Sequence, residues 1–276
     1  MIDYLSAEPW VSDFHCLKSL TRTASVPKVN FMPGFAKKTG GLLINEQWTM
    51  NNGQYKNGII KNLNQRSNEK TNCQLSIVNC QFKQVLFFAY PQDWSPVIRA
   101  MNRVFVKDTC VKVAAGAGQE SILKSCCENN SVFTPEKLSF MDQEDWDKMM
   151  HDMDFMIIRG EDSMAQACLT GTPFIWQAYP QKDEYQLVKV NALLNRMRNH
   201  FGKEFRYVET AWNAINKTEH TDNAALEENV FDFLKNLESL KPGFISFAKS
   251  LYENGDLADN LMTFILKSIR IEKINT

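Results

Sequence analysis

The sequence predicts an α/β fold built around a parallel sheet, and three observations support this prediction. Short apolar runs typical of buried strands alternate with amphipathic segments from about residue 84 onward. Strands that alternate with helices in this way pair in parallel through right-handed crossovers. The 276 residues, 44% of them hydrophobic, suffice for one large or two ordinary domains with a sizeable core.

The residues before this pattern differ in character. The opening segment is rich in aromatic residues, and its Pro and Gly residues indicate turns rather than regular elements. Residues 51–72 shift to Asn, Gln, Gly and Lys with few apolar side chains, so they are the best candidate for a linker.

The regular elements then follow in order. Apolar runs predict four strands: 84–89, 110–115, 155–158 and 174–178. Amphipathic or capped segments predict the helices: 96–104, 118–126, 142–152, 163–169, 184–200, 227–240 and 243–268.

Charge and residue usage exclude several functional classes. The 31 Lys and Arg residues balance 32 Asp and Glu residues, so the chain lacks the net positive charge of a typical nucleic-acid binder. No apolar run approaches membrane-spanning length, and the N-terminus has no basic stretch typical of a signal peptide. The seven Cys residues form no CxxC pair, and the four His residues show no metal-binding spacing. We therefore expect a cytoplasmic protein without a metal, a nucleic-acid partner or a membrane contact.

The junction between residues 155–158 and the next helix is the strongest candidate for a binding site. Arg159 and Gly160 end the strand, where the glycine allows a sharp turn. Ser163 and Gln166 have capping-box spacing, which predicts that the helix begins at Ser163. In a doubly wound sheet such a turn lies where ligands bind. The helix N-terminus and Arg159 would together suit the oxygens of a diphosphate.

The two acids of this turn, Glu161 and Asp162, would repel a phosphate, so we expect them to face hydroxyl groups or a charged acceptor. A surface turn in which Arg159 forms an ion pair is an equally good interpretation of the spacing alone. No GxGxxG or GxxxxGK[ST] motif is present, and the Gly116-Ala-Gly118 turn is only a weak partial match.

Aromatic residues are predicted at the same sheet edge. Tyr90 and Tyr179 end two of the strands, and Phe140 precedes the helix at 142–152. A planar base could stack on them, although packing at the rim is the commoner role of any single aromatic residue. The amide of Gln143 could complement a base, or it could be exposed to solvent.

These motifs resemble the protein-arginine rhamnosyltransferases, which modify an arginine of translation elongation factor P. The resemblance extends over about residues 2–267 and is carried by five segments: SAEPWVSDFH (6–15), PGFAKKTGGLL (33–43), RGEDS (159–163), PFIW (173–176) and YPQ (179–181). It implies a GT-B-like glycosyltransferase with two Rossmann-like domains. The implied reaction transfers L-rhamnose from dTDP-β-L-rhamnose to a guanidine nitrogen with inversion and without a metal cofactor.

The resemblance also implies the site residues. Those that would bind dTDP-rhamnose are Tyr90, Phe140, Gln143, Arg159, Asp162, Ser163, Tyr179 and Gln181. Tyr90 and Tyr179 would hold the thymine ring, and Phe140 and Gln143 would line the base or ribose pocket. The diphosphate would lie against Arg159 and its neighbours Asp162 and Ser163. Glu161 would be the catalytic acid near the sugar.

The chain departs from the family pattern at its N-terminus. The family begins with a strand and loop whose paired aspartates act on the acceptor arginine, and roughly a hundred residues with these aspartates have no counterpart here. We therefore expect residues 1–75 to be the remainder of an incomplete acceptor-binding domain, with 248–276 packing back onto it. Residues 76–247 would form the complete nucleotide-sugar domain.

This departure affects the expected activity. A guanidinium stays protonated at ordinary pH, so a carboxylate must orient it and accept its proton. We expect the chain to bind the donor and to be inactive alone unless a second polypeptide supplies the missing part. Two alternatives remain: a non-catalytic dTDP-sugar-binding module, and a flavodoxin-like or other nucleotide-binding α/β protein.

Overall fold

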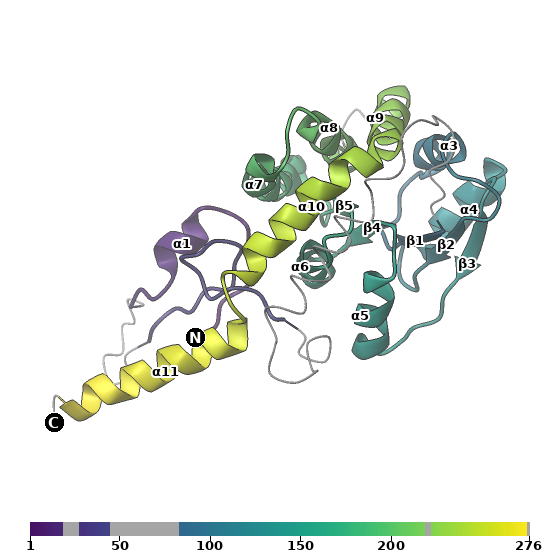
Figure 1. The fold of residues 1–276 in the computed structure, drawn as a ribbon. Helices are drawn as coiled ribbons and strands as arrows, with labels where there is room; N and C mark the ends of the chain where they lie inside the picture. The colour runs from purple at the N-terminus through teal and green to yellow at the C-terminus, as the bar shows by residue number, and fades with distance from the viewer. Residues whose placement is uncertain (19–27, 45–82, 219–221, 275–276) are drawn as a thin grey trace. The chain divides into compact units, whose positions relative to one another are not determined.

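The computed structural model describes residues 1–18, 28–44, 83–218 and 222–274 (Figure 1). The chain divides into two compact units, unit 1 (Met1–Asn64 and Ala248–Thr276) and unit 2 (Gln65–Phe247). The predicted linker at 51–72 and the predicted domain boundary at 75–76 lie outside the described residues.

Unit 2 contains a parallel sheet of five strands in the order β3-β2-β1-β4-β5. The strands are β1 (Gln84–Phe87), β2 (Cys110–Val113), β3 (Thr134–Lys137), β4 (Phe155–Arg159) and β5 (Phe174–Gln177). The predicted α/β class is therefore confirmed. Because β2 and β4 flank β1 on opposite sides, the strand order reverses between β1 and β4.

The central strands are buried on both faces, as parallel strands covered by helices must be. Residues 155–158 are fully buried, which explains why this segment is an unbroken apolar run rather than an alternating one. Val85 of β1 lies in register with Val111 of β2 and with Phe155 of β4. Next to them, the rings of Phe174 and Trp212 lie 5.0 Å apart and extend the core under the helices.

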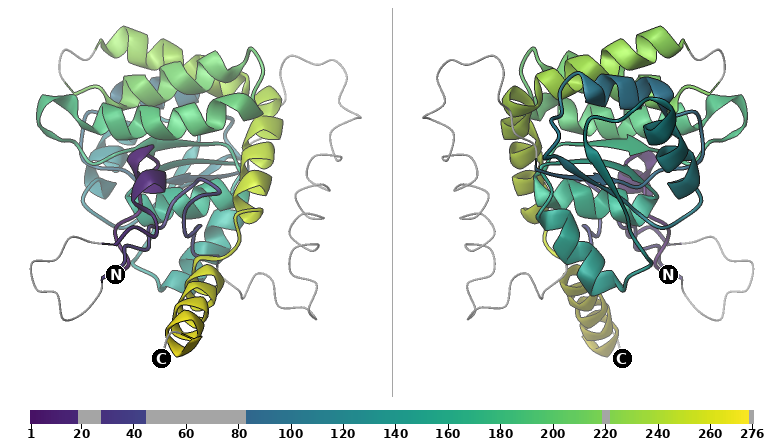
Figure 2. Two further views of the ribbon diagram at one scale, coloured as in Figure 1. Left: turned by 90° about the vertical axis from the view of Figure 1, so that its left-hand side faces the viewer. Right: turned by 90° about the vertical axis from the view of Figure 1, so that its right-hand side faces the viewer.

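Helices cover both faces of this sheet. Among the described residues, the helices that begin in unit 2 are α3 (Ser95–Asn102), α4 (Gln119–Glu128), α5 (Gln143–His151), α6 (Glu161–Thr170), α7 (Gln186–Met197), α8 (Phe205–Asn216), α9 (Asn223–Lys235) and α10 (Leu237–Tyr252), with 3₁₀ turns η2 (Lys182–Glu184) and η3 (Arg198–His200). Figures 1 and 2 show α3, α8 and α9 over one face of the sheet, with α5 and α6 under the other. The loops at the carboxyl ends of β1 and β4 therefore emerge between these two layers.

Among its described residues, unit 1 contains α1 (Trp10–Phe14), the C-terminal end of α10 and α11 (Leu257–Ile274), with irregular segments elsewhere. Single parallel bridges join Ile2 to Phe31 and Ser6 to Gly34. The last helix contacts this segment through the rings of Phe31 and Phe264, whose centroids lie 5.5 Å apart. The assignment of unit 1 to acceptor binding stays a prediction.

The predicted start of the helix after β4 is wrong. α6 begins at Glu161 with Gly160 as its N-cap residue, and no side chain caps it, so Ser163 and Gln166 form no capping box. Gly160 has φ +80° and ψ 156°, which ends the strand abruptly and lets the helix begin at the next residue. Glu161 and Asp162 then occupy the first turn, where acidic side chains interact favourably with the helix dipole.

Other elements also differ from the prediction. The strand at Thr134–Lys137 was not expected, because this mostly exposed edge strand (TPEK) contains no apolar run. The helix at Phe205–Asn216 was not expected either, although its buried residues recur at helical spacing. The helix predicted over 243–268 is two helices, because Gly255 adopts φ +82° between α10 and α11.

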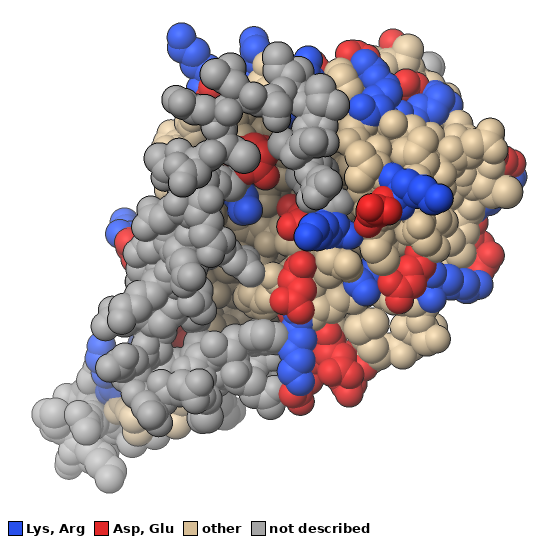
Figure 3. Space-filling view, turned by 45° about the vertical axis from the view of Figure 1, so that its right-hand side comes forward, with Lys and Arg blue, Asp and Glu red and all other residues tan. Residues whose placement is uncertain are grey.

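Charged side chains of both signs are interspersed on the face shown in Figure 3. Ion pairs between α3 and α9 include Arg99 with Glu227 at 2.6 Å and Arg103 with Glu228 at 2.7 Å. In the part of the chain that the structure describes, no helix has the length and apolar character needed to cross a membrane. The cytoplasmic location stays a prediction.

Candidate functional site

The candidate site lies where the strand order reverses, at the carboxyl ends of β1 and β4. Ligands of open α/β sheets bind at this position because the loops from the two strands diverge there. Phe88 and Tyr90 follow β1, and Arg159 is the last residue of β4. The sheet therefore brings the aromatic segment that ends at Tyr90 close to Arg159, although the two residues are 69 positions apart in the sequence.

The turn from β4 into α6 exposes the N-terminus of a helix at this edge. The positive φ of Gly160 makes the turn possible, and its carbonyl oxygen accepts a hydrogen bond of 3.2 Å from the Trp176 indole Nε1. Because no side chain caps α6, the N–H groups of its first turn retain their capacity to bind an acceptor. An uncapped helix N-terminus is well suited to an anion.

Arg159 lies beside this N-terminus, held by aromatic rings. Its guanidinium carbon is 4.3 Å from the ring centroid of Phe88 and 4.7 Å from that of Tyr90. Its Nε atom is buried and makes no hydrogen bond. A Cβ atom at Gly116 would lie only 2.9 Å from Arg159 Nη2, so the glycine leaves room for the guanidinium. Among the described residues no carboxylate forms an ion pair with Arg159, in contrast to the surface-turn interpretation.

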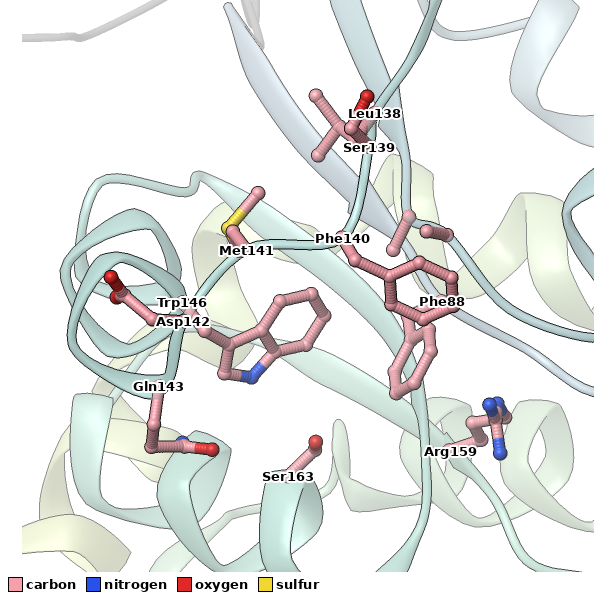
Figure 4. Close-up of a pocket in the computed structure, with 12 residues that line it drawn as sticks. Phe88, Leu138, Ser139, Phe140, Met141, Asp142, Gln143, Trp146, Arg159 and Ser163 are labelled. Atoms are coloured by element: carbon pink, nitrogen blue, oxygen red, sulfur yellow. The ribbon is translucent and has the colours of Figure 1, made fainter.

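A cavity of about 210 Å³ opens next to Arg159 (Figure 4). Its lining comes from the residue after β1, the β2–α4 turn, the β3–α5 loop, α5, the end of β4 and the start of α6: Phe88, Ala114, Ala115, Leu138, Ser139, Phe140, Met141, Asp142, Gln143, Trp146, Arg159 and Ser163. Four of the residues predicted from the sequence are therefore brought together in one cavity. In Figure 4 the Ser163 hydroxyl points into the space between Trp146 and Arg159.

Of the three aromatic residues predicted for the site, Phe140 lines the cavity, whereas Tyr90 and Tyr179 lie beside it. Phe140 lines the cavity and is 86% exposed, so one face of its ring is available to a planar ligand. Tyr90 borders the site through Arg159, and its ring meets that of Tyr179 edge to face at 5.3 Å. Tyr179 itself is 67% exposed and does not line the cavity.

Of the predicted polar residues, some line the cavity and others do not. Gln143 lines the cavity, but its amide Nε2 already donates a 2.7 Å hydrogen bond to Asp147 Oδ1. Asp162 and Gln181 are exposed and do not line the cavity.

Glu161 is paired with a lysine from another helix. Its Oε1 atom lies 2.9 Å from Nζ of Lys189 on α7, and the two side chains are 37% and 21% exposed. The acid that seemed misplaced beside a phosphate site is thus neutralised by a neighbouring cation.

Comparison with known proteins identifies the family. Residues 1–266 match the family described as "Elongation-Factor P (EF-P) rhamnosyltransferase EarP". The chain belongs to the EarP family.

Curated relatives agree with this assignment. A protein-arginine rhamnosyltransferase of Shewanella oneidensis is 25% identical over 97% of this chain and 69% of its own length. One of Pseudomonas putida is 28% identical over 71% of the chain and 53% of its length. The chain thus spans about half to two thirds of the length of such relatives. A solved structure described as the basis for EarP-mediated arginine glycosylation of elongation factor EF-P shares the fold, with a TM-score of 0.62 and 18% identity over 92% of this chain and 82% of that one.

Sequence reasoning missed three residues that shape the site of this EarP-family chain. Phe88 and Trp146 line the cavity and meet edge to face at 5.0 Å. Gln177 is buried at the end of β5, and its Oε1 accepts a 2.6 Å hydrogen bond from the backbone N–H of Tyr90. A signal for Gln177 was present, because a polar residue that ends an otherwise apolar strand needs a specific partner.

Among the described residues no group of three or more His, Cys, Asp or Glu side chains is placed to hold a metal ion. The groups present at the site are the Arg159 guanidinium, the N–H groups at the start of α6 and the aromatic rings that line the cavity.

Proposed function

We propose that unit 2 binds dTDP-β-L-rhamnose and that the chain serves the transfer of L-rhamnose to an arginine of translation elongation factor P. The observation that carries the proposal is the buried, unpartnered Arg159 Nε beside the uncapped N-terminus of α6. A buried donor without an acceptor is costly in the free protein, so it indicates a ligand with acceptor oxygens. A diphosphate fits both groups at once.

The proposed orientation of the donor follows from the shape of the cavity. The diphosphate lies against Arg159 and the first turn of α6, near the Ser163 hydroxyl. The thymine lies toward the β3–α5 loop, where the exposed ring of Phe140 offers a stacking surface. The sugar then projects from the carboxyl edge of the sheet.

In the proposed reaction, a guanidine nitrogen attacks the anomeric carbon as the bond to the diphosphate oxygen breaks. A single displacement inverts the configuration. Negative charge develops on the leaving diphosphate, and we propose that Arg159 and the N–H groups of the uncapped start of α6 stabilise it. The acceptor nitrogen must lose a proton, which requires a positioned carboxylate. We propose that Glu161, whose carboxylate is paired with Lys189, is the functionally important acidic residue near the sugar.

A second candidate function is a non-catalytic dTDP-sugar-binding module. It is compatible with the observation that all the residues lining the cavity belong to unit 2. Both functions require the donor site, and only the first requires transfer.

Calorimetric titration with dTDP-β-L-rhamnose tests the donor site, with FMN and NAD as control ligands. We expect binding of the dTDP-sugar alone. Binding of FMN or NAD in its place would support an unrelated nucleotide-binding protein. Mass spectrometry of elongation factor P after incubation with the chain and the donor then separates enzyme from module. A deoxyhexose on an arginine supports the enzyme, and an unmodified factor supports the module.

A further inference from the structure

The pairing of Glu161 with Lys189 indicates a role for a residue that the family motif does not contain. Lys189 lies on α7, 26 residues beyond Ser163, and its Nζ reaches back to Glu161 Oε1 at 2.9 Å. At 21% exposure its side chain is among the better-shielded lysine partners of the ion pairs in the described residues. The pair therefore joins α7 to the first turn of α6, at the proposed anion site.

Glu161 lies between two residues that line the cavity. It is two residues from Arg159 and two from Ser163, and each residue step spans about 3.8 Å between Cα atoms. A carboxylate at such a position lies within the roughly 8–10 Å over which charges interact at moderate ionic strength. Left unpaired, Glu161 would repel the diphosphate that Arg159 attracts.

We infer that Lys189 is a positioning residue for the donor site: it neutralises Glu161 and holds its carboxylate on the α7 side of the turn. This inference rests on the proposed function, because it requires that the cavity take a diphosphate. Removal of the ammonium would release a negative charge beside the ligand. The loss of affinity would then come from Glu161 rather than from a missing contact between Lys189 and the diphosphate.

A double-mutant comparison separates these causes. We expect Lys189→Met to weaken dTDP binding about fivefold at low ionic strength, the scale of a like-charge interaction over several ångströms in a partly solvated site. The loss should shrink in high salt, because salt screens charge repulsion. Adding Glu161→Gln to Lys189→Met should restore most of the affinity, because it removes the released charge.

Lys124→Met is the matched control. Lys124 pairs with Glu128 at 3.7 Å on α4, and neither residue lines the cavity, so we expect wild-type dTDP affinity. Thermal unfolding of each variant confirms that the fold is retained.

Three results would overturn the inference. Lys189→Met could bind dTDP as the wild type does while Arg159→Ala binds weakly. That result would support the proposed donor site and show that Lys189 has no role in it. The double variant could bind as weakly as Lys189→Met, which would assign the loss to a cause other than Glu161. A wild-type chain that binds no dTDP would contradict the proposed function as well.

Discussion

The two sides of the cavity differ in how far they are organised before a ligand arrives. On the β4–α6 side, Gly160 is held in a turn by Trp176, Arg159 lies between two rings, and Glu161 is paired with Lys189. On the β3–α5 side, Phe140 is 86% exposed at the end of a loop. The side proposed for the diphosphate is therefore organised before a ligand binds, whereas the side proposed for the base relies on an exposed ring.

This difference predicts how binding energy is distributed. A preorganised charged group loses little freedom when the ligand binds, so its contribution is retained in the affinity. An exposed ring must be immobilised first, which reduces its net contribution. Substitutions on the β4–α6 side should accordingly cost more than substitutions on the β3–α5 side.

The largest effect is expected from Arg159→Ala. Loss of a charge-assisted hydrogen bond donor should weaken dTDP binding by about 1.5–3 kcal/mol. Calorimetric titration measures the change, and Arg103→Ala is the control because Arg103 pairs with Glu228 away from the cavity. Equal affinities for the two variants would mean that Arg159 has no role in binding the anion.

Gly116→Ala should have the next largest effect. The new methyl group would lie 2.9 Å from Arg159 Nη2, at a backbone φ of +144° that disfavours any side chain. We expect the guanidinium to be displaced and dTDP affinity to fall by about 1–2 kcal/mol, with a loss of stability of about 1–3 kcal/mol. Titration and thermal unfolding measure the two losses. Gly202→Ala, where φ is not positive and the neighbour is the Glu204 carboxylate, should change neither quantity appreciably.

Phe140→Ala should cost less. Stacking of an aromatic ring on a base contributes about 1–3 kcal/mol, and the exposure of Phe140 places it at the lower limit, about 1 kcal/mol. Because the ring packs little in the free protein, the melting temperature should not change. A loss larger than that of Arg159→Ala would reverse the proposed difference between the two sides.

The smallest effect is expected from Gln143→Ala, about 0.5 kcal/mol or less in dTDP affinity, the lower end for one neutral hydrogen bond. The amide of Gln143 already bonds to Asp147, so a base would gain little by replacing that partner. A tenfold loss in titration would show instead that the amide turns toward the ligand and binds it.

The sequence was most informative where local chemistry and burial agree. The run at residues 155–158, followed by Arg159 and Gly160, predicted a buried strand and a sharp turn, and both are present. The predicted capping box is absent. Ser163 and Gln166 have the spacing of such a box, but α6 begins two residues earlier, at Glu161, so Ser163 is not at the N-cap position. A local pattern cannot tell which of two nearby residues begins a helix when a glycine of positive φ precedes them.

Contacts between distant segments were beyond local patterns. Nothing near Glu161 in the sequence indicates Lys189, and nothing near Arg159 indicates that Gly116 must lack a side chain. The contacts of Glu161 with Lys189 and of Arg159 with Gly116 form because the sheet topology brings distant segments to the same edge. Family resemblance supplied the names of site residues such as Tyr179 and Gln181, and their roles stay proposals.

The most direct test of the account compares thymidine with dTDP, because the two ligands share the base and sugar and differ only in the diphosphate. Competition titration against the wild type and Arg159→Ala gives the affinity advantage of dTDP in each protein. We predict a large advantage in the wild type that mostly disappears in the variant. An advantage of equal size in both would show that the turn between β4 and α6 does not hold the diphosphate.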